Sequence, residues 1–166
     1  MNNQIESIIG DYKKFLDKIF QNLKEAGFDS AEFEEIDHIA YRTESLESYE
    51  KIKKELLKFS KNYSEKMFGG RLIMVYLLEN PIVYNNFTIK GFELLAPKEN
   101  NSHKEGLEHA EFVTKTTLPE FQEKHHNINF DLHSYNREEN PELVLNFENC
   151  AAKFHVQSLL EVRGIY

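Results

Sequence analysis

Two histidines, each preceded by an acidic residue, are the residues best suited to chemistry in this sequence. Asp37-His38 and Glu108-His109 lie in the similar stretches 37–43 and 108–114, where an aromatic residue and a threonine also recur in register. A repeat of this kind is typical of two related structural units. Neutral imidazoles suit borderline divalent ions, so the repeat predicts one metal ligand from each unit.

Two further candidate ligands come from the strands that close the two units. Phe92-Glu93-Leu94 aligns with Phe154-His155-Val156, which pairs a carboxylate in one unit with an imidazole in the other. Side chains alternate faces along a strand, so the apolar neighbours of each candidate fall on the opposite face and pack on helices. The polar face is then a cup for one Zn, Ni, Fe or Mn ion. The predicted metal ligands are His38, Glu93, His109 and His155.

Two more residues of the same face are candidates for the reaction and for substrate binding. Glu111 lies two residues beyond His109, about 6 to 7 Å along a strand, where a carboxylate can act as a catalytic base or as another ligand. Arg42 offers a planar fork to an anionic group of a substrate. The alternative for all these residues is an ordinary solvated sheet face. The other histidines are predicted to lie at the surface: His103, His125, His126 and His133.

The elements that must position these residues follow an α+β order. Apolar spacing predicts one amphipathic helix over 5–23. A first β-α-β-β-β module is predicted at 36–42, 44–59, 63–68, 71–79 and 86–95, with Gly69-Gly70 as a hairpin turn. A second is predicted at 107–114, 118–126, 127–132, 142–147 and 150–156. We expect one domain, with an N-terminal helical extension (1–30) and modules at 31–98 and 99–166.

Length, charge and composition restrict the class of protein. A chain of 166 residues suits a single domain with a sizeable core. The net charge of −8 disfavours nucleic acid as a partner. The apolar run 72–78 is too short to cross a bilayer and the first residues carry no basic leader, so we expect a cytoplasmic protein without a membrane partner. The lone cysteine, Cys150, is expected in the core.

Several short motifs together resemble the YecM family over most of the chain. They are Asp37-His38-Ile39, Gly70-Arg71, Glu93-Leu94 leading to Pro97, Glu105-Gly106-Leu107-Glu108-His109, Asn140-Pro141 and Lys153-Phe154-His155. That family looks like a branch of the vicinal-oxygen-chelate (VOC) superfamily, which includes glyoxalase I, extradiol dioxygenases and fosfomycin-resistance proteins. The resemblance implies two βαβββ modules that form one curved mixed sheet around a metal cup.

The resemblance also implies where the metal ligands of the superfamily fall. They match His38, Glu93 and His109. The fourth position is usually a carboxylate in glyoxalase-like members but is His155 here, which argues against a direct transfer of glyoxalase chemistry. A metal-dependent isomerase, lyase or oxygenase acting on a small oxygen-bearing substrate is one hypothesis. A noncatalytic small-ligand-binding module and a partner-binding module are the others, and the oligomeric state stays open.

Overall fold

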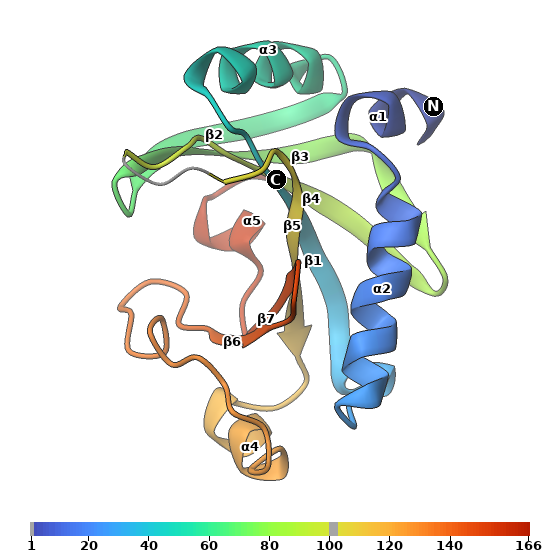
Figure 1. Cartoon of the computed structure of the whole chain (residues 1–166), viewed down its shortest axis with the longest axis vertical. Helices are drawn as coiled ribbons and strands as arrows, with labels where there is room; N and C mark the ends of the chain where they lie inside the picture. Colours follow the sequence, from blue (N-terminus) through green and yellow to red (C-terminus); the bar gives the residue numbers. More distant parts are fainter. Residues whose placement is uncertain (1, 100–102) are drawn as a thin grey trace.

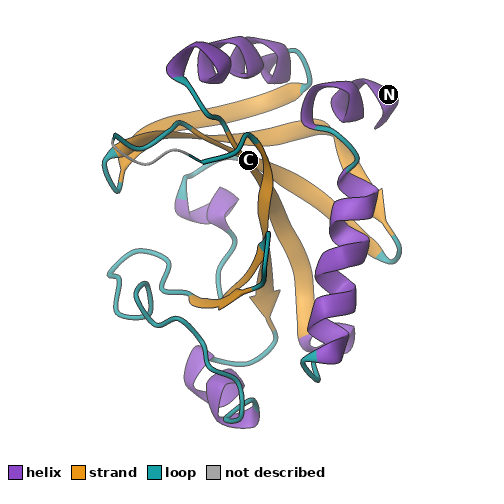
Figure 2. Cartoon of the chain, in the orientation of Figure 1, coloured by secondary structure: helices purple, strands orange, loops and turns teal. Residues whose placement is uncertain are grey.

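The computed structural model describes residues 2–99 and 103–166, which form one mixed sheet with helices around it (Figures 1 and 2). The strands run in the order β2-β3-β4-β1-β5-β7-β6. The strands are β1 (Phe33–Arg42), β2 (Ser60–Phe68), β3 (Arg71–Tyr84), β4 (Phe87–Leu95), β5 (Gly106–Thr114), β6 (Leu143–Asn146) and β7 (Ala151–His155). The helices are α1 (Asn2–Ile9), α2 (Tyr12–Glu25), α3 (Leu46–Leu57), α4 (Leu118–Lys124) and α5 (Leu159–Val162), with a 3-10 turn at Ser30–Glu32.

The two repeated strands lie side by side at the centre of the sheet. β1 and β5 pair antiparallel, and each also pairs in parallel with a later strand of its own half, β4 on β1 and β7 on β5. An antiparallel pair of equivalent strands relates the two halves by a pseudo-twofold axis that passes between them. The expected α+β architecture with a curved mixed sheet is therefore confirmed.

One expected strand of the second half does not form. The prediction of a strand near 127–132 is wrong, because only an isolated bridge between Asp131 and Val144 is present there. The backbone after α4 instead makes short-range turns, in which the amides of Ile128 and Phe130 donate to carbonyls two or three residues earlier. Amides used in this way are not available for a strand ladder.

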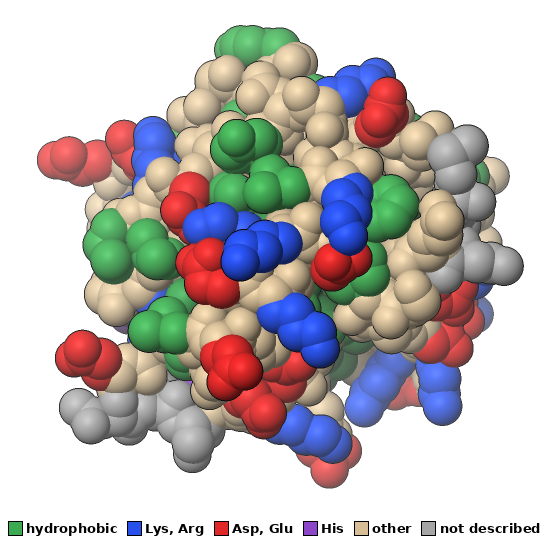
Figure 3. All heavy atoms as spheres, turned by 90° about the horizontal axis from the view of Figure 1, so that it is seen from above, with side chains coloured by type: hydrophobic (Ala, Val, Ile, Leu, Met, Phe, Trp, Pro, Cys, Tyr) green, Lys and Arg blue, Asp and Glu red, His purple; other side chains and the backbone are tan. Residues whose placement is uncertain are grey.

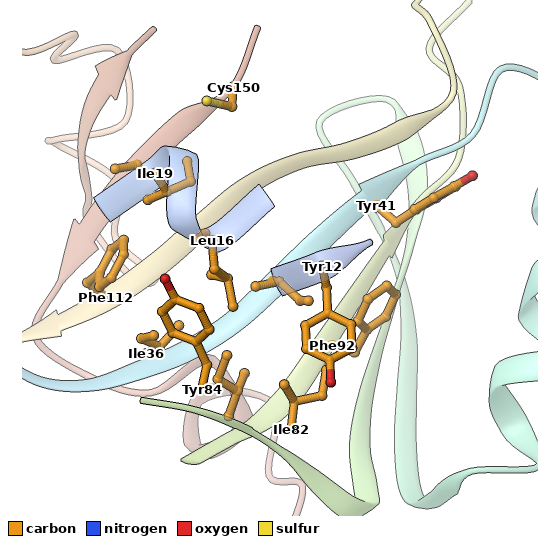
Figure 4. Close-up of a cluster of buried hydrophobic side chains, with 14 of the residues drawn as sticks. Tyr12, Leu16, Ile19, Ile36, Tyr41, Ile82, Tyr84, Phe92, Phe112 and Cys150 are labelled. Carbon is orange, nitrogen blue, oxygen red and sulfur yellow. The ribbon is translucent and has the colours of Figure 1, made fainter. Parts of the chain in front are cut away.

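The predicted N-terminal helix is two helices rather than one. Gly10 adopts a φ of +86°, which glycine tolerates without strain and which ends α1. The side chain of Asp11 then accepts a hydrogen bond from the amide of Lys14 and caps α2. The inner face of α2 is buried against the convex side of the sheet, where Figure 4 shows it over Ile36, Phe92 and Phe112. Its buried residues are Tyr12, Leu16, Ile19 and Leu23.

The concave side of the sheet is partly covered by α5 (Figure 1). Leu159, Leu160 and Ile165 pack on a small separate cluster of Ala40, Ile73, Val75 and Leu95. The polar cup that the sequence predicts on this side is thus buried under a helix.

The outer surface carries mixed charge. Acidic and basic side chains lie interspersed on the face seen in Figure 3. Lys53 on α3 and Lys58, which follows it, each pair with a glutamate at 2.7 Å. Among the described residues, no helix is both long and apolar enough to cross a membrane.

Candidate metal centre

Two histidines and two glutamates meet on the concave face of the central strands. One ligand atom from each of His38, Glu93, His109 and Glu111 lies within 4.8 Å of those of the other three, and all four side chains are buried. Glu93 Oε2 lies 3.3 Å from His109 Nε2 and 3.8 Å from His38 Nε2. Glu111 Oε1 lies 3.1 Å from His109 Nε2 and 3.6 Å from His38 Nε2.

Strand alternation explains how these side chains reach one face. Ile39 on β1, Ala110 on β5 and Phe92 on β4 turn towards the helices and are fully buried in the core. Their neighbours His38, His109 and Glu93 therefore point to the concave side. Gly91 lies opposite His38 in the β1–β4 register, and a Cβ atom there would lie only 2.9 Å from the Cβ of His38. The glycine leaves room for the Cβ of His38 and the carbonyl oxygen of Asp37.

The acidic residue before each histidine sits in a β-bulge. The register between β1 and β5 shifts by one residue at Asp37 and again at Glu108, the equivalent position of the second half. A bulge re-aims the side chain that strict alternation would turn to the other face. Asp37 consequently accepts a hydrogen bond of 2.8 Å from His38 Nδ1, while Glu108 Oε1 lies 3.5 Å from His109 Nδ1.

Asp37 orients the imidazole of His38 in the way that a supporting carboxylate orients a metal-bound histidine, whereas Nδ1 of His109 has no hydrogen-bond partner in the described structure. Because the Nδ1–H group of His38 donates to Asp37, the other ring nitrogen, Nε2, faces the cup. Nε2 of His38 and Nε2 of His109 are both buried without a hydrogen-bond partner in the described structure. Asp37 also accepts from the hydroxyl of Ser158 and from the amide of Leu159, so it links His38 to the start of α5.

The electrostatics of the cluster favour charged carboxylates. Burial alone would raise the pKa of Glu93, but the imidazoles of His109 and His38, which face its carboxylate, lower it below its ordinary value. Burial alone would lower the pKa of His38, and the Glu111 carboxylate and Asp37 raise it well above its ordinary value. Burial and the positive charge of Lys153 would lower the pKa of His109. The carboxylates of Glu108, Glu111 and Glu93 outweigh both effects and raise this pKa to about 9. A bound cation would replace protons on these imidazoles.

The position equivalent to Glu93 in the second half is a lysine. His38 lies opposite Gly91, and the equivalent His109 lies opposite Ala151, so Glu93 corresponds to Lys153. The alignment of Glu93 with His155 is therefore displaced by two residues. Lys153 Nζ donates to Glu111 Oε1 at 2.9 Å and lies 3.7 Å from Glu142, and these carboxylates raise its pKa despite its burial.

His155 is not brought into the four-residue group. It lies further along β7, where its Nε2 is 3.7 Å from Glu111 Oε2 and 3.8 Å from Asp37 Oδ2. Its Nδ1 lies 2.6 Å from the backbone oxygen of Gln157 and 3.1 Å from Asn140 Oδ1. His155 thus forms a second group, with Asp37 and Glu111, beside the first.

The two residues predicted for catalysis and substrate binding are both engaged with neighbours. Glu111 is one of the four clustered side chains and pairs with Lys153, rather than standing apart as a free base. The guanidinium of Arg42 makes a two-contact ion pair with Glu108, through Nη2 at 2.6 Å and through Nε. Arg42 therefore supports the acidic neighbour of His109.

One of the four histidines expected at the surface is buried. His125, which follows α4, stacks on Phe28 with ring centroids 4.1 Å apart, and its Nε2 lies 2.8 Å from Glu32. The prediction failed because the apolar surface that covers this ring comes from a distant part of the chain. His103, His126 and His133 are exposed, and Cys150 is buried as expected.

A cavity of about 460 Å³ opens onto the cup. Glu93, Glu111 and Lys153 line the cavity on the side of the cup. The β2–β3 hairpin, the segment 133–142 and α5 contribute other parts of its wall. Arg71, at the start of β3, lines the same cavity. Sequence reasoning gave no function to Asp37, Lys153 or Arg71, although the repeated acid-histidine pair was a signal for the first.

Comparisons with known proteins place the chain among relatives of similar sequence and fold. The model of a family described as "YecM protein" matches residues 4–139. An uncharacterized protein of Haemophilus influenzae is 32% identical over 113 residues, which are 68% of this chain and 59% of that protein, so the chain spans less than two-thirds of this relative.

Two solved structures share the fold. A structural-genomics protein designated EC4020 has a TM-score of 0.76 at 21% identity, with 91% of this chain and 86% of that chain covered. A Bacillus subtilis protein described as a "putative dioxygenase" has a TM-score of 0.51 at 8% identity, with 76% of this chain and 42% of that chain covered.

Proposed function

The chain belongs to the YecM family, and on that premise we propose that it binds one divalent transition-metal ion in its buried cup and uses it on a small oxygen-bearing substrate. The ligands are His38, Glu93, His109 and Glu111. The observation that carries the proposal is the pair of buried, unpartnered Nε2 atoms that face two carboxylates.

The donor set fits such an ion. Ligand atoms bound tetrahedrally at 2.0 to 2.2 Å lie about 3.4 Å from one another, and the nitrogen-to-carboxylate separations in the cup are 3.1 to 3.8 Å. Two imidazoles and two carboxylates suit Zn, Ni, Fe or Mn. When bound, the ion supplies Lewis-acid polarisation of substrate oxygens. Asp37 holds the imidazole of His38 in place by a hydrogen bond, and Glu108 lies beside that of His109.

A metal-free ligand-binding module is the second candidate, and Lys153 is the observation that favours it. Its ammonium group already lies 2.9 Å from Glu111 and neutralises part of the negative charge of the cup. In that case Lys153 takes the place of the ion as the cation of the site. Metal content separates the two candidates directly.

The test begins with elemental analysis of protein purified without an affinity tag or added metal. Zinc, nickel, manganese and iron(II) affinities are then measured by calorimetry for the parent protein and for Glu93→Ala, Glu111→Ala and His155→Ala. Loss of a supporting residue alone costs about 10 to 100-fold in metal affinity, so each glutamate substitution should cost at least that. His155→Ala should cost less, because its Nε2 lies outside the four-residue group.

Glu139→Ala is the matched control, since Glu139 is an exposed carboxylate at the same cavity and lies outside both ligand groups. One ion per chain with the stated order of losses supports the proposal. Absence of bound ion together with equal, weak affinities in all variants would leave Lys153 as the cation of the cup.

A further inference from the structure

The guanidinium of Arg71 is a half-buried cation that pairs with no carboxylate of the described residues. Its Nη1 is inaccessible to solvent and has no hydrogen-bond partner in the described structure, and no carboxylate of the described residues lies within ion-pair distance. A buried charge is costly unless it is paired and hydrogen-bonded. Burial and the nearby Arg42 lower the pKa of Arg71 from its ordinary value. The guanidinium of Arg71 therefore lacks a negatively charged partner among the described residues.

Three other cations of this region are paired within the chain. Arg42 is held by Glu108, and Arg137 donates to Glu142 at 3.1 Å. Lys153 is held by Glu111. Arg71 stands apart from them although it follows directly on the Gly69-Gly70 turn, which fixes the backbone from which its side chain enters the cavity.

The same cavity connects Arg71 with the carboxylates of the cup. Arg71, Glu93 and Glu111 all line the space of about 460 Å³, which is in the range of small-ligand sites. Lys98 and Arg163 add positive charge to its wall. A small molecule in this space contacts Arg71 on one side and the cup on the other.

We propose that Arg71 binds the anionic group, a carboxylate or a phosphate, of the small molecule that this protein takes into the cavity. A guanidinium presents two parallel N–H donors in the geometry that both groups accept, and it pairs with them more strongly than a neutral donor does. The inference builds on the proposed function in that the same cavity holds the metal cup. It moves the substrate-binding arginine from Arg42 to Arg71.

The experiment measures binding of three probes, malonate, succinate and inorganic phosphate, to the whole chain by calorimetry at low ionic strength. Each probe is titrated into chelator-treated protein and into zinc-loaded protein. The variants are Arg71→Gln, which removes the charge, and Arg71→Lys, which keeps the charge without the fork. Lys61→Gln is the control, because it removes a positive charge from an exposed position on β2.

The expected result is that Arg71→Gln weakens binding of the best probe by about 10-fold or more, the scale of a lost charged hydrogen-bond pair. Arg71→Lys should retain part of the affinity, and Lys61→Gln should match the parent. The carboxylate and phosphate arms identify which anion the site prefers. Equal affinity of the parent and Arg71→Gln for every probe would overturn the inference, as would failure of the parent to bind any probe in either form.

Stability gives a second readout that does not depend on a ligand. Replacing an unpaired, partly buried charge by an apolar side chain of similar length should be neutral or stabilising, so Arg71→Met should melt at or above the parent. A lower melting temperature would mean that the guanidinium already has a stabilising partner, and would refute the argument. Zinc affinity, measured for the parent and for Arg71→Gln, separates the metal proposal from the proposal that Arg71 binds an anion. If zinc does not bind but anion binding still depends on Arg71, only the metal proposal fails.

Discussion

Gly91→Ala is the sharpest single test of how the cup is built. Gly91 lies on β4 directly beside His38 on β1. An added Cβ would lie 2.9 Å from the carbonyl oxygen of Asp37 and 2.9 Å from the Cβ of His38, whereas ordinary contacts begin at 3.4 Å. Neither neighbour can swing aside, because one is backbone of a strand paired on both sides and the other is fixed to it.

The cost follows from that geometry. Overpacking a filled core typically costs about 1–3 kcal/mol of unfolding free energy, and a clash with two fixed atoms belongs in the upper part of that range. The movement that relieves it shifts His38 and its bond to Asp37. A misplaced ligand should lose about 10 to 100-fold in metal affinity, as loss of a supporting residue does.

The assay has two parts. Urea unfolding of the chelator-treated protein gives the change in stability, and zinc calorimetry on the folded protein gives the change in affinity. Gly10→Ala is the matched control, because its φ of +86° makes alanine strained there while nothing lies within 4 Å of the added Cβ. That variant should lose stability and keep its zinc affinity.

The result that refutes this reasoning is a Gly91→Ala protein with the stability and zinc affinity of the parent. Loss of stability with unchanged affinity would show that β4 moves as a unit and that His38 does not depend on the space beside it.

Three further predictions concern the rest of the molecule. Deleting residues 1–26 should lower the melting temperature, because α2 buries four side chains in the core, and an unchanged transition in a thermal scan would contradict this. Zinc at 100 times its dissociation constant should stabilise the chelator-treated protein by about 2.7 kcal/mol, and equal melting curves would count against the metal proposal. Burial would raise the pKa of Glu32, but interactions with the Asp29 backbone, His125 and Lys124 lower it from 4.5. The contribution of Glu32 to stability is therefore complete at neutral pH and is lost as the pH falls below that value. Glu32→Gln should therefore cost up to about 1 kcal/mol at pH 7 and progressively less in acid, and a loss that does not depend on pH would indicate a packing effect instead.

The part of the site that follows strand alternation could be predicted from the sequence. His38, Glu93 and His109 lie on strands whose apolar residues mark the helix-facing side without ambiguity, so their convergence on the other face needs only the correct sheet. The contribution of Glu111 to the same face follows from its spacing of two from His109.

The features that sequence reasoning missed depend on local departures from regular structure or on distant contacts. A bulge at Asp37 reverses the face that alternation predicts, and no residue pattern marks it. The short strand β7 contains too few residues to fix its register by pattern, so Glu93 was matched with His155 instead of Lys153. Arg42 pairs with Glu108, whereas Arg71 has no such partner among the described residues. Both facts depend on which residues are neighbours in the folded structure, and the sequence does not show this.

The bond between Asp37 and the start of α5 also sets the order in which the cup can be assembled during folding. Asp37 and Ser158 are separated by 121 residues, so this contact closes a loop that contains nearly the whole sheet. Contacts of such long range form only after the entropy of closing the intervening chain has been overcome. We therefore expect His38 to reach its final orientation late in folding, after both central strands are in place. On the proposed function, an ion would then bind to an already folded sheet, in contrast to zinc fingers, whose metal is required to fold the chain at all.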